Sequence, residues 1–307
     1  MGSYSIKDLE KLSGIKAHTL RMWESRYGII NPQRTETKIR VFNDEELKKV
    51  LNISFLNHNG YKISRIAKME AQEILGLVAK ISSSNMEISN QLDSLTMAMI
   101  NLDEMQFDKI VGTFTLQIGF ERTMLELIFP FLRKIGVLWL TGNINPAHEH
   151  FIANLVRQKL IVASDGQVIP HTDNVRKYGL FLPEGELHEI SLLFAYYLIK
   201  KRNCKAIYLG QNLPIADVEM VDSVYDPHYL LTFITSSPSG DKLLPYLLDL
   251  ASRFPQKKVL VAGYGIKALK EKLPENMLYF NSIPELVEFI EDENRSSVST
   301  KTLALNL

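Results

Sequence analysis

The apolar positions between residues 86 and 163 recur at helical spacing, and no strand-like alternation interrupts them. The pattern predicts four amphipathic helices joined by short loops: 87–100, 103–117, 120–140 and 146–163. Pro146 suits the first turn of the fourth helix, because its missing N–H would have no helical partner there. Four such helices bury their apolar faces together as a four-helix bundle, which we expect over residues 86–165.

The pattern changes after about residue 175, where short apolar runs alternate with helical stretches. The runs are YGLFLP, KAIYLG, YLLTFIT and KVLVAG, with LYF as a weaker fifth. The helical stretches are 188–201, 215–224, 240–254, 265–272 and 284–292. This alternation predicts a doubly wound, parallel-sheet, Rossmann-like α/β domain over residues 175–292, with ligands bound beyond the carboxyl ends of its strands. We expect residues 293–307 to form a disordered tail.

The first 72 residues carry the signals of a winged helix-turn-helix domain. Ser5 and Asp8 have the spacing of a capping box, which opens a helix that Gly14 ends. A second helix is expected over about 17–25. The segment INPQRTETKIRVF then predicts two short extended runs around a turn, which would form the wing. Because the second helix of such a unit enters the major groove, residues 1–72 are expected to bind DNA.

Charge is distributed unevenly along a chain whose formal net charge is zero. Residues 1–69 hold thirteen Lys and Arg against seven Asp and Glu, and the remainder is correspondingly acidic. A basic module favours a polyanion-binding surface, although a helical domain with solvated basic side chains is the alternative. The single cysteine, Cys204, excludes an internal disulfide, and no apolar run is long enough for a membrane span. We therefore expect a cytoplasmic protein.

The segment SGIKAHTLRMWESRYGIINPQRTETKIRVF closely resembles the MerR family of winged helix-turn-helix regulators. Its Trp-Glu-x-Arg-Tyr-Gly motif is similar to the subgroup of cobalamin-dependent photoreceptor repressors that includes CarA, CarH and LitR. The resemblance implies that Trp23 belongs to the core. It implies DNA contacts, mostly to the backbone, for Thr19, Arg21, Tyr27, Arg34 and Arg40.

A second resemblance concerns the α/β domain. Cobalamin-binding domains carry Asp-x-His-x-x-Gly, then Ser-x-Leu, then Gly-Gly, each at a strand end. This chain has the corresponding groups Glu186-x-His188-x-x-Ser191, Thr232-x-Ile234 and Ala262-Gly263 at matching spacing. The resemblance implies that His188 ligates cobalt, that Glu186 orients it and that Thr232 contacts the nucleotide tail. Without this resemblance, His188 would be interpreted as a helix-capping or solvent-exposed histidine. Ser191 and Ala262 stand where cobalamin-binding domains have glycine, and their side chains narrow the cleft for the cofactor.

The third motif lies at the junction of the last two helices of the bundle. Trp139 is followed after nine residues by Glu149 and His150, as in the helical cap of the cobalamin photoreceptors. The resemblance implies that these three side chains cover the upper face of the corrin. The alternative is a core tryptophan and a favourable glutamate at a helix N-terminus. Photoreceptor members have a histidine after the tryptophan that ligates cobalt after illumination, whereas this chain has Leu140.

These resemblances predict a transcriptional regulator, not an enzyme, whose affinity for DNA is controlled by cobalamin, with adenosylcobalamin as the expected form. Because Leu140 replaces the photoreceptor histidine, we expect either a weaker light switch or a protein that senses cobalamin itself rather than light. Expected partners are a palindromic double-stranded promoter site and further copies of the chain, as a dimer or tetramer, with no membrane. The alternative is a cobalamin-independent MerR-type regulator whose α/β domain serves self-association or partner binding. A cobalamin-dependent methyltransferase would need a substrate-activating domain, for which 307 residues leave no room.

Overall fold

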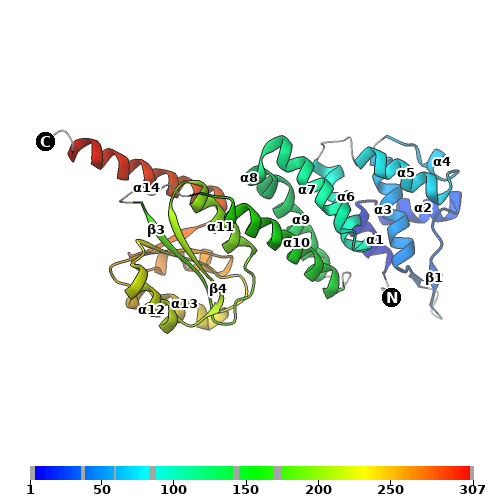
Figure 1. Cartoon of the computed structure of the whole chain (residues 1–307). Coiled ribbons are helices and arrows are strands. Elements are labelled where there is room, and N and C mark those ends of the chain that lie inside the picture. The colour runs from blue at the N-terminus through cyan, green and yellow to red at the C-terminus, as the bar shows by residue number, and fades with distance from the viewer. Residues whose placement is uncertain are drawn as a thin grey trace. The chain divides into compact units, whose positions relative to one another are not determined.

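The computed structural model describes residues 4–35, 39–58, 60–82, 88–140, 145–168 and 175–304. The chain forms two compact units, Met1–Leu155 and Val156–Leu307, which are described separately (Figure 1). The division falls inside one helix, α10 (Pro146–Asp165), which therefore contributes to both units. The finer division into domains at 1–72, 86–165 and 175–292 stays a prediction.

The first unit begins with the helix-turn-helix. Helix α1 (Ile6–Ser13) has the predicted capping box, in which Ser5 and Asp8 satisfy each other's backbone N–H groups. Gly14 ends α1 in the left-handed conformation, which glycine adopts without steric cost. Helix α2 (Ala17–Tyr27) follows and buries Leu20 and Trp23. The expected core position of Trp23 is confirmed.

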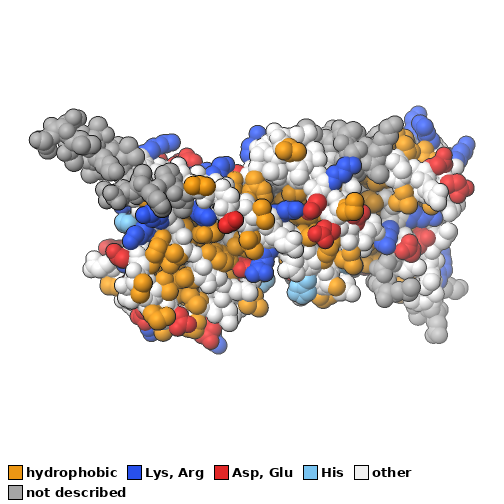
Figure 2. All heavy atoms as spheres, in the orientation of Figure 1, with side chains coloured by type: hydrophobic (Ala, Val, Ile, Leu, Met, Phe, Trp, Pro, Cys, Tyr) orange, Lys and Arg blue, Asp and Glu red, His pale blue; other side chains and the backbone are white. Residues whose placement is uncertain are grey.

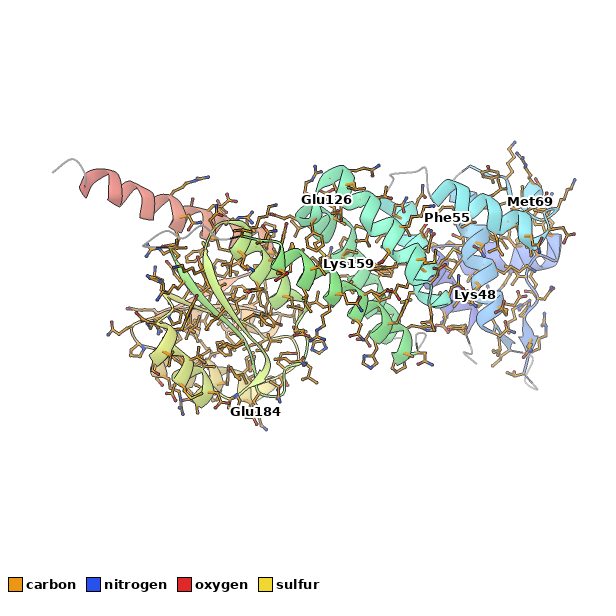
Figure 3. All side chains as sticks on the ribbon, in the orientation of Figure 1. Lys48, Phe55, Met69, Glu126, Lys159 and Glu184 are labelled. Atoms are coloured by element: carbon orange, nitrogen blue, oxygen red, sulfur yellow. The ribbon has the colours of Figure 1, made fainter. Side chains whose placement is uncertain are left out.

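The predicted wing is a two-stranded antiparallel ladder of β1 (Gln33–Arg34) and β2 (Arg40–Val41). It leads into α3 (Asp44–His58), whose Phe55 is fully buried (Figure 3). Two further helices, α4 (Ile63–Ile66) and α5 (Ala71–Ser82), follow. Helix-turn-helix and wing therefore form as the capping and turn signals predicted.

The helical part after residue 88 contains α6 (Ile88–Asn101), α7 (Glu104–Ile118) and the first part of α10. Between them lie α8 (Phe120–Thr123), a π-helical turn (Met124–Ile128) and α9 (Phe129–Leu140), in place of one uniform helix over 120–140. In this turn the N–H of Phe129 reaches back to the carbonyl of Met124. Pro130 has no N–H to donate, and such local widening accommodates its ring.

The second unit is a five-stranded, wholly parallel sheet with the strand order β4-β3-β5-β6-β7. Its strands are β3 (Lys177–Pro183), β4 (Lys205–Leu213), β5 (Tyr229–Phe233), β6 (Lys258–Ala262) and β7 (Met277–Phe280). Its helices are α11 (Ile190–Lys201), α12 (Ile215–Tyr225), α13 (Leu243–Arg253) and α14 (Ile283–Ala304), with 3₁₀ turns at Gly240–Lys242 and Gly265–Lys272. The predicted doubly wound architecture is confirmed.

Two apolar layers hold this sheet, one on each face. Tyr178, Leu180 and Leu182 alternate along β3 and pack with residues of α11 and α14. Phe181 points the opposite way and packs with residues of α13 and with Val218 of α12. Because successive side chains of a strand face opposite sides, a strand covered on both faces is apolar throughout. This explains the nearly continuous apolar run that marked β3 in the sequence.

The expectation of a disordered tail at 293–307 is wrong for residues 293–304, which continue helix α14. Side chains near the start of this segment are anchored on the α/β domain. Glu293 accepts a hydrogen bond from the Tyr229 hydroxyl, and Asn294 donates to the carbonyl of Arg202. No Gly or Pro occurs after Pro284 to end the helix, and extending a formed helix is easier than starting one.

Candidate functional site

Loops after β3 and β5 meet at the carboxyl end of the sheet. The chain leaves β3 through α11 toward β4 on one side, while β5 lies on the other side of β3. This order is the flavodoxin-like one, and ligands of such sheets bind at the switch point between these two strands. Glu184 opens the loop after β3 and lies at the edge of the domain (Figure 3). The predicted ligand-binding segment therefore occupies the position at which this fold places ligands.

Glu186 joins the two loops through a fully buried carboxylate. It accepts backbone N–H bonds from Leu187 and His188 on its own loop, both at 3.0 Å. It also accepts N–H bonds from the loop after β5: Thr235 at 2.8 Å, Ser236 at 2.6 Å and Ser237 at 3.1 Å. Burial raises the pKa of this carboxyl, but these hydrogen bonds outweigh burial and lower its pKa to about 2. Glu186 is therefore ionised at neutral pH.

His188 is held by this carboxylate. Its Nδ1 lies 2.6 Å from Glu186 Oε1 and 3.3 Å from the Ser236 hydroxyl, while 57% of the side chain is exposed. An ionised carboxylate can only accept, so Nδ1 carries the proton of the neutral ring and Nε2 keeps its lone pair. A carboxylate on the far nitrogen is the arrangement that orients metal-binding histidines. His188 is thus prepared to ligate a metal through Nε2.

The described residues contain no group of three or more His, Cys, Asp or Glu side chains placed to hold a metal ion. His188 would therefore be a single protein ligand, which suits a metal whose other ligands come from a macrocycle. The chemistry of the donor set fits a corrin-bound cobalt.

Thr232 supplies a second test of fit. It lies near the end of β5 with a fully buried side chain, and its hydroxyl has no hydrogen-bond partner among the described residues. An unsatisfied buried hydroxyl is costly, and a polar group of a ligand would remove that cost. Ser191 lies half-buried in the first turn of α11, and Ala262 lies partly exposed at the end of β6. Ser191 thus follows β3, Thr232 lies near the end of β5 and Ala262 ends β6.

The backbone at position 263 can accommodate only glycine. Its φ is +154°, and a Cβ at this position would lie 2.0 Å from the carbonyl oxygen of Ile234. The Ile234 N–H also donates to the carbonyl of Ala262 at 2.9 Å. Glycine therefore allows the loops after β5 and β6 to approach closely. This provides a structural reason for the one glycine that the cobalamin motif retains here.

Sequence reasoning missed an ionic group directly after His188. The Glu189 carboxylate is largely buried and accepts bonds from Arg157 Nε of α10 at 2.6 Å and from the Tyr208 hydroxyl of β4 at 2.7 Å. Burial and the neighbouring carboxylate both raise the pKa of Tyr208, so its hydroxyl keeps the proton that it donates. The group ties the His188 loop to α10. Its partners are distant in sequence, so no local pattern could have indicated it.

The predicted cap residues lie around the junction of α9 and α10. The backbone of Trp139 and Leu140 ends α9, but their side chains, and residues 141–144, lie outside the described residues. Glu149 is half-buried and His150 exposed at the start of α10. The Asn145 side chain accepts the N–H of Ala147, which caps this helix. That Trp139, Glu149 and His150 surround one ligand stays a prediction.

Predicted DNA contacts are distributed over α2 and the wing. Arg21 is exposed on α2, and Thr19 and Tyr27 are half-buried. Arg34 and Arg40 lie on β1 and β2. Figure 2 shows Lys and Arg side chains of this module interspersed with Asp and Glu. Arg21 on α2 and Arg34 and Arg40 on the wing are thus at least partly exposed, and that these side chains contact DNA stays a prediction.

Comparison with known proteins identifies two of these parts. Residues 4–73 match the model of the MerR HTH family of regulatory proteins, and residues 91–163 match that of the B12 binding domain. The HTH-type transcriptional repressor CarH of Myxococcus xanthus is 23% identical over 262 residues, covering 83% of this chain and 86% of CarH. The chain is a MerR-family regulator with a cobalamin-binding domain.

Two further relatives agree with this assignment. The HTH-type transcriptional repressor CarA of Myxococcus xanthus is 23% identical over 288 residues, covering 92% of this chain and 94% of CarA. The HTH-type transcriptional regulator MlrA of Escherichia coli (strain K12) is 34% identical over 73 residues, 24% of this chain and 30% of MlrA. In the part of this MerR-family chain that the structure describes, no helix is both long and apolar enough to cross a membrane.

Proposed function

We propose that this chain is a DNA-binding transcriptional regulator whose affinity for DNA is controlled by cobalamin. The observation that carries the proposal is the Glu186–His188 pair at the switch point of the sheet, with Nδ1 engaged and Nε2 left for a metal. The MerR module at residues 4–73 and the B12 binding domain at residues 91–163 precede this pair in the same chain, so that a DNA-binding part and a cofactor-binding part are joined. CarH and CarA are transcriptional repressors, which supports regulation rather than catalysis.

Each residue of the site would have a distinct part in holding cobalamin. His188 would ligate cobalt from below, and Glu186 would fix its ring. The buried Thr232 hydroxyl, which has no partner among the described residues, would form a hydrogen bond with the nucleotide tail of cobalamin. Ser191, Ala262 and Gly263 would lie beside the cofactor. Trp139, Glu149 and His150 would cover the upper ligand, and we propose adenosylcobalamin as the form bound. When bound, the adenosyl form supplies a carbon–cobalt bond that light can break.

The alternative is a cobalamin-independent MerR-type regulator whose α/β domain serves self-association or partner binding. Ser191 and Ala262 favour it, because both add a side chain where the cobalamin motif has glycine. Absorbance of the purified full-length chain after incubation with adenosylcobalamin in the dark and gel filtration separates the two. Our proposal requires a cobalamin spectrum that elutes with the protein, and a colourless protein fraction would establish the alternative.

We further propose that two copies of the module bind a palindromic duplex, because two-fold dimers recognise two related half-sites. A footprint of the full-length chain on duplexes selected from a random pool is expected to show two related half-sites. Protection of one isolated half-site by one copy would contradict this arrangement.

Arg21→Ala is expected to weaken DNA binding by several-fold and to reduce the slope of log K against log salt by about 0.9, since one phosphate contact is lost. The loss should be similar for all duplex sequences, because a phosphate contact carries no base information. Fluorescence anisotropy with a labelled duplex at several salt concentrations measures both quantities.

Arg133→Ala is the matched control, since Arg133 is an exposed arginine of α9 outside the MerR module. It removes the same charge and should leave both affinity and salt slope unchanged. An equal loss in the two variants would mean that only net charge matters.

Illumination of the chain loaded with adenosylcobalamin is expected to give no lasting spectrum of cobalt with imidazole on both faces. Leu140 occupies the position of the photoreceptor histidine, and its side chain has no lone pair for a metal. Spectra recorded before and after illumination and gel filtration test this. A stable bis-imidazole spectrum would contradict the inference from Leu140, and His148→Ala and His150→Ala would then identify the substitute ligand.

A further inference from the structure

Glu24 on α2 contacts both arginines of the wing. Its Oε1 accepts a bond from Arg34 Nη2 at 3.2 Å, and its Oε2 accepts one from Arg40 Nε at 2.7 Å. Arg34 lies on β1 and Arg40 on β2, so one carboxylate engages each strand of the wing. The Glu24 side chain is only 17% exposed, whereas Arg34 and Arg40 are 50% and 31% exposed. The carboxylate is therefore largely buried beneath the two arginines, whose guanidinium groups are more exposed to solvent.

We infer that Glu24 is a positioning residue of the DNA-binding surface: it fixes the wing on α2 and orients Arg34 and Arg40 toward phosphates. The inference rests on the proposed DNA binding of the MerR module. Each guanidinium uses only one nitrogen for Glu24, and its other nitrogens keep N–H groups that a phosphate can accept from. Pairing with Glu24 therefore restricts the two side chains without consuming their capacity to bind.

Among the described residues the backbone ladder within the wing is short, although Phe42, directly after β2, exchanges two backbone hydrogen bonds with Tyr4. Its ladder pairs only Gln33 with Val41 and Arg34 with Arg40, and Thr35 adds an N–H bond to the Ile39 carbonyl. A two-stranded hairpin is marginal by itself in water, so side-chain ties to a helix add to its order. Glu24 supplies two such ties from the helix that enters the major groove.

The sign of one substitution distinguishes positioning from simple electrostatics. A carboxylate near DNA repels phosphates, so removing its charge should strengthen binding if charge alone matters. If Glu24 positions two arginines, removing its charge should weaken binding instead. Glu24→Gln keeps the size of the side chain and removes the charge that holds both guanidinium groups.

The experiment uses the full-length chain and a labelled 30-base-pair duplex, selected on the wild-type chain from a random-sequence pool. We expect Glu24→Gln to lower the affinity about tenfold and to reduce the salt slope by about 1 to 2, as for one or two lost phosphate contacts. Glu45→Gln is the control, because Glu45 is 81% exposed on α3 and pairs only with Lys48 among the described residues. It removes the same charge and should not weaken binding.

A double-substitution cycle separates positioning from a general effect on folding. In an Arg34→Ala/Arg40→Ala background, Glu24→Gln should cause no further loss, because the residues through which it acts are absent. Glu24→Asp keeps the charge but has a shorter side chain, so it should lose less affinity for DNA than Glu24→Gln. This variant replaces Glu24→Gln in the experiment if Glu24→Gln does not fold.

Two results overturn the inference while DNA binding stands: Glu24→Gln binds as tightly as or more tightly than wild type, or it weakens binding equally in the double-alanine background. If the Gln variant does not fold, a Glu24→Asp variant with wild-type affinity overturns it equally. A wild-type chain that enriches no duplex overturns the proposed DNA binding itself, and the inference with it.

Discussion

His188→Ala is expected to lower the affinity of the chain for adenosylcobalamin by at least about 100-fold, or to leave it bound with the spectrum of a cobalt that lacks its lower ligand. His188 would be the only protein ligand to the metal from its loop, and changes to groups that merely orient a metal ligand already cost 10- to 100-fold. Equilibrium dialysis in the dark with absorbance detection measures both the affinity and the ligation state.

His228→Ala is the control for this variant. His228 belongs to the same unit but lies just before β5, at the amino end of the sheet, where its Nδ1 accepts the N–H of Lys177. The His228→Ala variant should bind adenosylcobalamin with the affinity and the spectrum of wild type. If His188→Ala retained both the affinity and the spectrum of wild type, the position of cobalt proposed here would be wrong.

Glu186→Gln is expected to lower the free energy of unfolding of the α/β domain by about 3 kcal/mol at neutral pH, because an amide NH₂ would face N–H donors of two loops. The folded pKa of about 2 lies below the reference value of 4.5. The stability that ionised Glu186 contributes is therefore present above about pH 4.5 and is lost as the pH falls toward 2. Urea unfolding between pH 7 and pH 3 measures this contribution.

The Glu186→Gln variant should show a flatter loss of stability over this acid range than wild type, since it has no carboxyl to protonate there. Glu184→Gln is the matched control, because Glu184 is an exposed carboxylate of the same loop. It should retain the wild-type pH dependence. An equally steep acid transition in Glu186→Gln would show that the buried carboxylate does not govern it.

Local sequence patterns predicted the structure correctly where residues close together in the sequence determine it. The capping box of Ser5 and Asp8 predicted the start of α1, and the apolar runs predicted β3 to β7 because strands covered on both faces must be apolar. The strand-end position of His188 followed from the same pattern. Spacing also put Glu186 two residues before it, where their contact forms within one loop.

Patterns failed where the deciding partner is distant in sequence. Glu24 pairs with residues 10 and 16 positions later, and Glu189 pairs with Arg157 and Tyr208 on other elements. Residues 293–304 form helix because anchors from other elements hold the start of that segment, although its polar composition favoured disorder. Composition reports average solvation and cannot specify such contacts.

Cobalamin control of DNA affinity can be measured in a single titration. The full-length chain is titrated in the dark onto the selected 30-base-pair duplex, with and without saturating adenosylcobalamin, at one fixed salt concentration. We expect the two DNA dissociation constants to differ by about 5- to 150-fold, the range of ordinary coupling between two sites. Equal dissociation constants, in a sample whose absorbance shows that cobalamin is bound, would contradict it.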